Sequence, residues 1–566
     1  MLSFLNNNAS IRPYAAGIIL LWAIAFAIRI FAPSDLMDDD QERPCAYVMD
    51  VLQNGHWIVQ QDDTGDITSK PPMLTWLAAV SSKALGHASR FSVALPNALA
   101  ALATALLLLF VGRRYFGASA SAVAAFFFLL SPVGFKQLAL IRTDPLFTFT
   151  VFLAAVLAFH AWMNGRGWTW FWLAAAAATL TKGPLAVVLS LAGLAAGFWE
   201  HRGERPRISI PRMLWPSLPL YLILVFGWLT LAVWSMGRPI LDKLLLRELL
   251  GHAVSEEGGF PGSHFYQSPA FFVMGFLPWS ILTIIGLWRV WRKPSADLLT
   301  RRFERFLFCM FLIGLVIFSI PLHQRSVLIL PLIPAAALLA GSEAARFIEN
   351  FTARDRRLIV AACTAIMLAY EAVYYFTVRP SKPQVAETAG AIAIAKQLRE
   401  QVGPGFPLIY LDSPYALQFY YQSMRTKQFR KTGLQAMQNG HDAFYAISNV
   451  DKFHKALDEN SPAMTPLLRW PQTGEPQIAI FSNHPRLEYT PKMATFCGRI
   501  LLQMENVKLV QARNNDLVIK LGKEKPNTVA LQNTSDKQAI IFLRTMEQSQ
   551  GDRIVLEANE KKEMGY

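Results

Sequence analysis

The chain has 566 residues, of which 53% are hydrophobic and only 17% are charged, and its net charge is +14. This composition leaves too little polar surface to cover several water-soluble domains, and the apolar residues occur in long runs. The positive charge does not indicate a nucleic-acid-binding protein, because the basic residues do not cluster with aromatic residues on a soluble module.

The apolar runs predict a bundle of transmembrane helices. A helix needs about 20 apolar residues to cross a hydrocarbon layer about 30 Å thick, since its backbone groups must be hydrogen-bonded within the helix. The first run is followed by no small-residue cleavage site, so we interpret it as an anchor rather than a cleaved signal peptide. Eleven runs reach or nearly reach this length, and several of them are short: 11–32, 92–112, 118–135, 145–163, 168–181, 184–199, 214–236, 269–288, 306–320, 327–341 and 358–376.

The basic residues predict the orientation of these helices, because positively charged loops stay on the cytoplasmic side. They fall into alternate connections: Arg113 and Arg114, Arg166, 202–212, 289–305 and 346–357. This pattern places the N-terminus in the cytoplasm. The loops predicted to be extracytoplasmic are 33–91, 136–144, 181–183, 237–268, 321–326 and everything after residue 377.

Composition divides the chain into a transmembrane domain, 1–379, and a soluble extracytoplasmic domain, 380–566. We expect juxtamembrane helices in the first exterior loop, 33–91. The tail has helical apolar spacing over 385–402 and short apolar runs at 408–411, 443–447 and 478–481, so we predict a small α/β domain whose last residues are loosely ordered. Cys45 and Cys497 both fall in segments predicted to be extracytoplasmic, which allows a disulfide between them.

The first exterior loop contains an acidic cluster that includes Asp40, followed by Arg43, Gly55-His56-Trp57 and Lys70-Pro71. Long structured loops tend to be functional, and a carboxylate at a membrane surface can act as a general base. The alternative is a solvated cap on the first helix.

Asp144 and Lys182 are the charged residues of two further exterior turns. Asp144 begins a span after Arg142 and before Pro145, where it can cap the helix or take part in chemistry. Lys182 lies between two spans with almost no loop, so its charge must reach the surface or pair with an anion. An anionic headgroup and Asp144 are the two candidate partners.

The loop after the seventh predicted span has the composition of a flexible lid over a membrane-level pocket. It contains Arg247, Glu248, His252 and His264 among glycines. His252 and His264 allow a divalent metal such as Zn, although no compact ligand motif is present, and solvated histidines are the alternative. Arg325, in a short exterior turn, can hold a phosphate or can simply anchor the helix at the interface.

In order, these elements resemble the GT-C superfamily of lipid-linked sugar transferases, and within it the bacterial 4-amino-4-deoxy-L-arabinose (aminoarabinose) transferases that modify lipid A, relatives of the protein O-mannosyltransferases. The Asp-Glu-x-Arg element of the family is matched by Asp40-Gln41-Glu42-Arg43 except at Gln41. The other elements are Gly55-His56-Trp57, Lys70-Pro71, Asp144-Pro145, Thr181-Lys182-Gly183 and Leu277-Pro278-Trp279. A Lys-Leu-Pro element is replaced by the stretch around Arg325.

The resemblance implies a polytopic α-helical membrane protein of the GT-C type, with about 11–13 transmembrane helices and a C-terminal soluble α/β domain. It implies transfer of a sugar from undecaprenyl phosphate to lipid A phosphate at the periplasmic face of the bacterial inner membrane, and hence polymyxin resistance, by a monomer. Asp40, Lys70 and Asp144 are then the expected catalytic residues. The expected substrate-binding residues are Arg43, Arg142, Lys182, Arg247, Glu248, His264 and Arg325. Two alternatives are protein O-mannosyl transfer to Ser or Thr, and a lipid transporter or flippase.

Overall fold

The computed structural model describes residues 11–38, 40–62, 66–200, 210–215, 217–243, 265–321, 324–349, 351–402, 409–410, 415–422, 445–450, 465–470, 478–482, 494–496, 500–505, 507–513, 516–521, 528–545 and 552–565. It divides into two compact units. The membrane unit comprises Met1–Pro33, Asn54–Gln60 and Ile67–Pro380, and the tail unit comprises Ser34–Gln53, Gln61–Asp66 and Ser381–Tyr566. The first exterior loop is thus shared between the two units, which the sequence did not predict.

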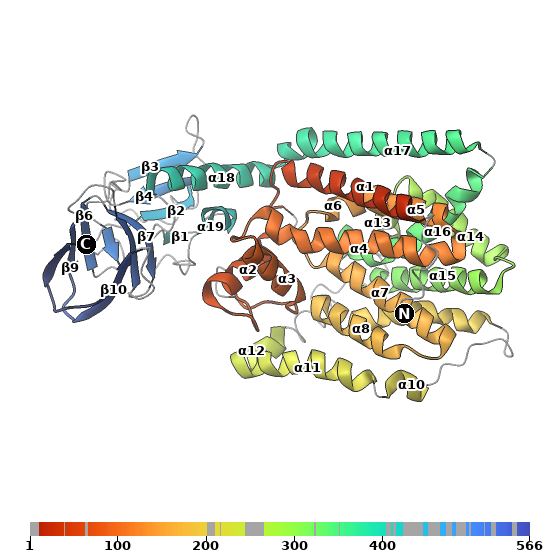
Figure 1. Ribbon diagram of the computed structural model, residues 1–566, viewed down its shortest axis with the longest axis horizontal. Helices are drawn as coiled ribbons and strands as arrows, with labels where there is room; N and C mark the ends of the chain where they lie inside the picture. Colours follow the sequence, from red (N-terminus) through yellow and green to blue (C-terminus); the bar gives the residue numbers. More distant parts are fainter. Residues whose placement is uncertain are drawn as a thin grey trace. The chain divides into compact units, whose positions relative to one another are not determined.

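The described part of the membrane unit is helical (Figure 1). Its helices are α1 Arg12–Phe31, α3 Met73–Ala84, α4 Arg90–Phe116, α5 Ala118–Leu130, α6 Pro132–Gln137, α7 Asp144–Asn164, α8 Trp168–Lys182, α9 Leu185–Ala192, η2 Gly193–Trp199, α10 Ile210–Leu214, α11 Ser217–Met236, α12 Arg238–Leu241, α13 Gln267–Gly275, α14 Trp279–Arg292, α15 Leu298–Ser319, η4 Ser326–Leu332, α16 Ile333–Phe347, α17 Ala353–Val373, η5 Tyr374–Val378 and η6 Arg379–Ser381. Each of the eleven predicted apolar runs coincides with one or two of these helices.

Six helical stretches among the described residues are long and apolar enough to cross a membrane: Arg12–Phe31, Arg90–Phe116, Asp144–Asn164, Ile210–Met236, Ser326–Phe347 and Arg354–Ser381. The pair α13 and α14, bent by 117° at Leu277-Pro278, adds a seventh if it is one span. α5 and Leu185–Trp199 are shorter apolar helices. The chain is therefore a multi-pass membrane protein, and the exact number of spans stays a prediction.

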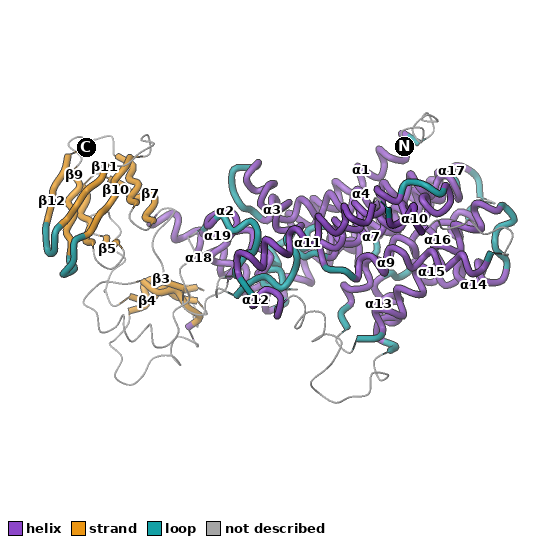
Figure 2. Tube along the Cα trace, turned by 90° about the horizontal axis from the view of Figure 1, so that it is seen from below, coloured by secondary structure: helices purple, strands orange, loops and turns teal. Residues whose placement is uncertain are grey.

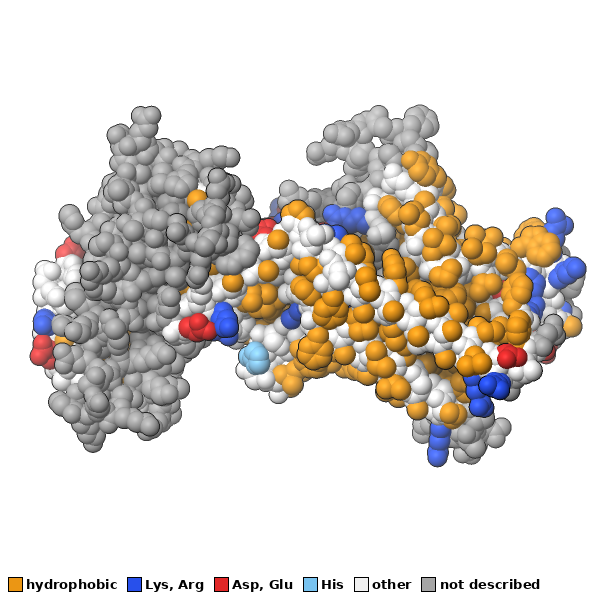
Figure 3. All heavy atoms as spheres, turned by 90° about the horizontal axis from the view of Figure 1, so that it is seen from above, with side chains coloured by type: hydrophobic (Ala, Val, Ile, Leu, Met, Phe, Trp, Pro, Cys, Tyr) orange, Lys and Arg blue, Asp and Glu red, His pale blue; other side chains and the backbone are white. Residues whose placement is uncertain are grey.

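The outer surface of the membrane unit is strongly apolar. Hydrophobic side chains cover most of the face of this unit that is seen in Figure 3. Trp234 is 86% exposed and Ile223 is 68% exposed, both on α11. Such side chains would be costly in water, and lipid is the environment that accommodates them.

α16 forms the centre of the membrane unit. Every residue from Ile333 to Glu343 is buried, because α5, α14, α15 and η4 pack around this helix. A helix that is apolar on all sides is expected to be enclosed in this way. Gly341 allows the closest approach, since a Cβ atom there would lie 2.6 Å from the carbonyl oxygen of Ala120 on α5.

The tail unit contains the helices α2 Glu42–Asn54, α18 Pro383–Val402 and α19 Tyr415–Tyr421, and its strands are drawn in orange in Figure 2. The strands are β1 Ile409–Tyr410, β2 Tyr445–Asn449, β3 Thr465–Trp470, β4 Ile478–Ser482, β5 Ala494–Phe496, β6 Ile500–Glu505, β7 Val507–Arg513, β8 Asp516–Leu521, β9 Thr528–Asn533, β10 Ala539–Thr545, β11 Asp552–Leu556 and β12 Lys561–Gly565.

These strands form three four-stranded sheets, with the orders β1-β2-β4-β3, β11-β10-β8-β7 and β12-β9-β6-β5. β1 pairs with β2 and β8 with β10 in parallel, and the other pairs are antiparallel. The predicted α/β character of the tail is confirmed. The expectation of a loosely ordered end is wrong, because β12 pairs with β9 over five residues, from Lys561 opposite Gln532 to Gly565 opposite Thr528.

Contacts inside the tail unit hold the first part of the exterior loop. Lys382 forms an ion pair of 3.3 Å with Asp38, and the backbone N–H of Met37 donates to Thr388 Oγ1 of α18. Cys45 is a free thiol with no exposed surface, so the disulfide that the sequence allowed is not formed. Its proposed partner, Cys497, lies outside the described residues.

Candidate functional site

The site is built around the carboxylate of Asp144, which is buried at the first residue of α7. Arg142 Nε donates to Asp144 Oδ2 over 3.0 Å, and Lys182 Nζ donates to Asp144 Oδ1. The side chains of Arg142 and Lys182 are only 10% and 17% exposed. Of the two partners that the sequence left open for Lys182, Asp144 is therefore confirmed.

The two helices that carry this pair run antiparallel and are joined by a short turn. α7 and α8 pack along their lengths, so the first residue of α7 and the last residue of α8 meet at the same end. Asp144 lies at the positive end of its helix dipole and Lys182 at the negative end of its own, and both positions favour the charge present. The residue in the N-cap position is Thr143, so capping does not explain Asp144.

Asn97, on α4, fixes the turn that carries Arg142. Its side-chain nitrogen donates to the carbonyl oxygens of Leu140, at 2.7 Å, and Arg142, at 2.8 Å, and the residue is fully buried. The sequence analysis missed this residue. A lone asparagine inside an apolar span was the available signal, because polar residues inside membrane helices are rare and tend to be functional.

Lys70 is the third cation of the site, and its positive charge acts on Asp144 together with those of Lys182 and Arg142. Two apolar clusters place it there. Met73 packs with Leu180 of α8 in one, and Leu74 packs with Leu146 of α7 in the other. Because α3 begins at Met73, the preceding Lys70-Pro71-Pro72 segment lies beside the ends of both helices.

The Gly55-His56-Trp57 element supports the same segment. Gln60 Nε2 donates to the carbonyl oxygens of His56 and Trp57, and the Trp76 indole also donates to the Trp57 carbonyl over 2.6 Å. The N–H of Thr68 donates to the Gln60 carbonyl, and the Thr68 hydroxyl donates to the carbonyl of Lys70. The backbone around Lys70 is thus fixed by hydrogen bonds on both sides.

Asp40 and Arg43 belong to the tail unit, where both residues are exposed. Asp40 has a left-handed backbone conformation, with a φ of 56°. Gln41 is buried, and its side-chain nitrogen donates to the carbonyl oxygens of Asp35 and Asp38. A glutamate could not donate these bonds, so the departure from the family pattern at Gln41 has a structural explanation.

The remaining predicted residues are not placed in the Asp144 cluster. Arg325 is exposed and directly precedes η4, and among the described residues it is not one of the cations whose charge acts on Asp144. Arg247, Glu248, His252 and His264 lie outside the described residues. Within the described ranges no three His, Cys, Asp or Glu side chains form a group able to hold a metal, so a metal at His252 and His264 stays a prediction.

Three of the four side chains of the cluster, Lys70, Arg142 and Lys182, are cationic, and Asp144 is anionic. Such an arrangement suits an anionic ligand, because a preformed set of cations stabilises negative charge with little reorganisation. The buried Asp144 holds two of the cations in fixed positions, as an outer hydrogen-bonded group does for a metal ligand or a catalytic base.

Comparison with known proteins finds similarity to sugar transferases. A family described as dolichyl-phosphate-mannose-protein mannosyltransferase matches residues 69–234, a region that includes Lys70, Asp144 and Lys182. The undecaprenyl phosphate-alpha-4-amino-4-deoxy-L-arabinose arabinosyl transferase 1 of Pseudomonas fluorescens is 23% identical over 393 residues, which are 65% of this chain and 65% of that protein.

Solved structures share the fold. ArnT from Cupriavidus metallidurans bound to undecaprenyl phosphate superposes with a TM-score of 0.62 at 18% identity, covering 83% of this chain and 97% of that one. Its apo state gives a TM-score of 0.61 at 17% identity, with the same coverage. The predicted resemblance is thus confirmed: the chain is similar to the lipid-linked sugar transferases of the GT-C superfamily and has their fold.

Proposed function

We propose that this protein is a glycosyltransferase that takes its sugar from a polyprenyl phosphate at the extracytoplasmic face of the inner membrane. The observation that carries the proposal is the Asp144 cluster, in which Arg142 and Lys182 bind one buried carboxylate at one end of the helical bundle and Lys70 adds a third nearby positive charge. The leaving group of the reaction is a phosphate, and these cations are the groups that would stabilise it.

The reaction exchanges one bond to the anomeric carbon of the sugar for another. An oxygen of the acceptor forms a bond to that carbon while the bond to the donor phosphate oxygen breaks. The electron pair of the broken bond stays with the polyprenyl phosphate, which gains negative charge. An acceptor phosphate is already ionised and has no proton to lose, whereas a hydroxyl acceptor must pass its proton to a base.

In this mechanism Lys70 contacts the leaving phosphate, with Lys182 and Arg142 as neighbouring cations and with Arg43 and Arg325 as helpers. Asp144 acts as a positioning residue, because both of its oxygens already bind cations. Asp40 orients the acceptor, holds the amino group of the sugar, or serves as base for a hydroxyl acceptor. We assign further substrate contacts to Arg247, Glu248 and His264, and a metal, if one binds, to His252 and His264.

For the substrates we propose 4-amino-4-deoxy-L-arabinose as the sugar, undecaprenyl phosphate as the carrier and lipid A phosphate as the acceptor. The similarity to the Pseudomonas fluorescens arabinosyl transferase and the shared fold with ArnT support this choice. The added amino group would lower the negative charge of lipid A, and weaker binding of polymyxin and other cationic peptides would follow.

Protein O-mannosyl transfer is the second candidate, because the family that matches residues 69–234 carries that description. Mass spectrometry of lipid A from cells with and without the gene separates the two. We expect the amino sugar on lipid A only when the gene is present. An unchanged lipid A together with altered glycosylation of secreted proteins would favour the second candidate.

A flippase is the competing class of function. The purified protein in detergent, without a sealed vesicle, should transfer labelled sugar from the polyprenyl phosphate to lipid A. A transporter moves its substrate between two compartments and would give no product in this assay. Labelling of single cysteines at positions 40 and 182 with a membrane-impermeant reagent tests the orientation, and reaction from the same side of intact cells is expected.

A further inference from the structure

A second cluster of charged residues lies at the other end of the membrane unit. Two residues of α4 contact opposite ends of the membrane unit. Asn97 donates to the carbonyl of Arg142, and the carbonyl of Tyr115 accepts a hydrogen bond from Thr300 of α15 over 3.3 Å. The 18 residues between these positions span roughly 27 Å, which is close to the thickness of the hydrocarbon layer. The start of α15 therefore lies at the membrane surface opposite the Asp144 cluster.

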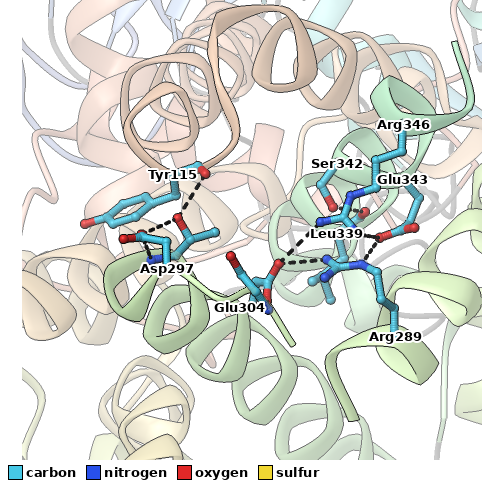
Figure 4. Close-up of polar contacts among 10 residues, drawn as sticks. Tyr115, Arg289, Asp297, Glu304, Leu339, Ser342, Glu343 and Arg346 are labelled. Carbon is cyan, nitrogen blue, oxygen red and sulfur yellow. Dashed lines mark hydrogen bonds and ion pairs between the residues drawn. The ribbon is translucent and has the colours of Figure 1, made fainter. Parts of the chain in front are cut away.

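At this surface Arg289 joins the ends of three helices (Figure 4). Its guanidinium, on α14, donates to Glu343 of α16 and lies 2.8 Å from Glu304 of α15. All three side chains are at most 10% exposed, and Glu304 also accepts a hydrogen bond from the N–H of Ser295. This network holds the last turn of α14 rigidly against α15 and α16.

A second face of α14 is exposed, and it changes from apolar to basic toward the end of the helix. Ile281, Ile284, Trp288 and Trp291 follow one another at intervals of three or four residues and are 57%, 51%, 60% and 61% exposed. This spacing places them on one helix face. The exposed residues Arg292 and Lys293 come directly after them.

Arg346, at the end of α16, is a third accessible cation beside Arg292 and Lys293. Its side chain is 48% exposed, and its nitrogens lie 3.9 Å from both Glu304 and Glu343, beyond hydrogen-bonding distance. The buried Arg289 already neutralises part of the charge on these two carboxylates. The guanidinium of Arg346 is therefore held near the end of α14 while much of it remains accessible.

We propose that the outer face of α14 and the end of α16 form a binding site for an anionic phospholipid of the leaflet opposite the Asp144 cluster. The distance from Ile281 to Lys293 is roughly 18 Å along the helix, the depth of one leaflet. The acyl chains pack on the two isoleucines, the tryptophans lie at the level of the glycerol, and Arg292, Lys293 and Arg346 bind the phosphate.

Native mass spectrometry of the full-length protein with phosphatidylglycerol and phosphatidylcholine tests this site. The wild type should retain phosphatidylglycerol in preference to phosphatidylcholine. The variant Arg292→Gln/Lys293→Gln/Arg346→Gln should lose about tenfold or more in affinity for phosphatidylglycerol, since each cation near an anionic lipid contributes a factor of about five.

A matched control removes the same charge from other exposed arginines at this surface, in the variant Arg114→Gln/Arg354→Gln/Arg357→Gln, and should keep the affinity. If the triple variant does not fold, Arg292→Gln/Lys293→Gln leaves the Arg289 network intact and should still weaken binding. An equal loss in the two triple variants, or equal retention of the two lipids by the wild type, would overturn the proposal.

Discussion

Lys182 Nζ donates a hydrogen bond to Asp144 Oδ1, and this pair joins the last residue of α8 to the first residue of α7. The two residues are 38 positions apart in the chain, and they meet because the helices are antiparallel neighbours. Lys182 also lies over the ring of Phe147, one turn into α7, with 5.5 Å between its nitrogen and the ring centroid. The position of this cation is therefore fixed on two sides.

We expect Asp144→Ala to destabilise the protein by about 3–5 kcal/mol, because it leaves two mostly buried cations without their counter-ion. The double variant Asp144→Leu/Lys182→Met should be more stable than Asp144→Ala, since it removes both members of one pair. Thermal unfolding in detergent measures both effects. A double variant that is no more stable than Asp144→Ala would show that the two residues are not coupled.

Lys70→Ala should lower the rate of sugar transfer by roughly 10²–10³-fold while leaving the protein folded, because it removes a charge aimed at the leaving phosphate. Lys70→Arg should keep part of the activity. Lys83→Ala is the matched control, since Lys83 is an exposed lysine in the last turn of α3 and should transfer at the normal rate. Near-normal transfer by Lys70→Ala would refute the assignment.

The variants of Asp40 must tolerate its left-handed backbone, because a φ of 56° strains most residues. Asn and Gly adopt this conformation readily, whereas Ala costs about 1 kcal/mol. We expect Asp40→Asn and Asp40→Gly to melt like the wild type and to transfer sugar to lipid A roughly 100-fold more slowly, in line with loss of a charge that orients the acceptor or holds the amino group of the sugar. If Asp40→Asn retains full activity with lipid A, the carboxylate has no role in that reaction.

Asn97→Ala should cost about 1–3 kcal/mol for each of the two buried carbonyl oxygens that lose their donor. It should also slow transfer, because the turn that carries Arg142 loses its anchor. Asn164→Ala provides the comparison: this exposed residue at the far end of α7 bonds only to the neighbouring turn in the described contacts, at the carbonyl of His160. Equal melting temperatures for the two variants would contradict the prediction.

Burial, and secondarily the nearby charge of Glu42, raises the pKa of the Cys45 thiol well above its ordinary value. The thiol stays protonated in the folded protein, so its contribution to stability is full below the pKa of the unfolded thiol, about 8.5, and is lost as the pH rises through and above that value. In a variant with Cys45 as the only cysteine, a maleimide should react slowly at pH 8 and quickly after denaturation. Fast labelling of the folded protein would show that the thiol is accessible.

The periodicity and length of the apolar runs determined the helical bundle. A membrane span must form all of its backbone hydrogen bonds within its own helix, so a continuous stretch of sequence is enough to specify it. The short apolar runs at 408–411, 443–447 and 478–481 predicted β1, β2 and β4 in the same way. The candidate residues Lys70, Asp144 and Lys182 were also visible in the sequence, as isolated charges at the ends of apolar runs. Their chemical roles remain proposals.

Only the tertiary structure decided which of these charges meet. The pairing of Asp144 with Arg142 and Lys182, and the anchoring of their turn by Asn97, depend on how α4, α7 and α8 pack. The same holds for the assignment of residues 34–53 to the tail unit and for the ordered strand β12, whose polar sequence gives no apolar signal. Packing brings together residues that are distant in the chain, and local sequence patterns do not predict such contacts.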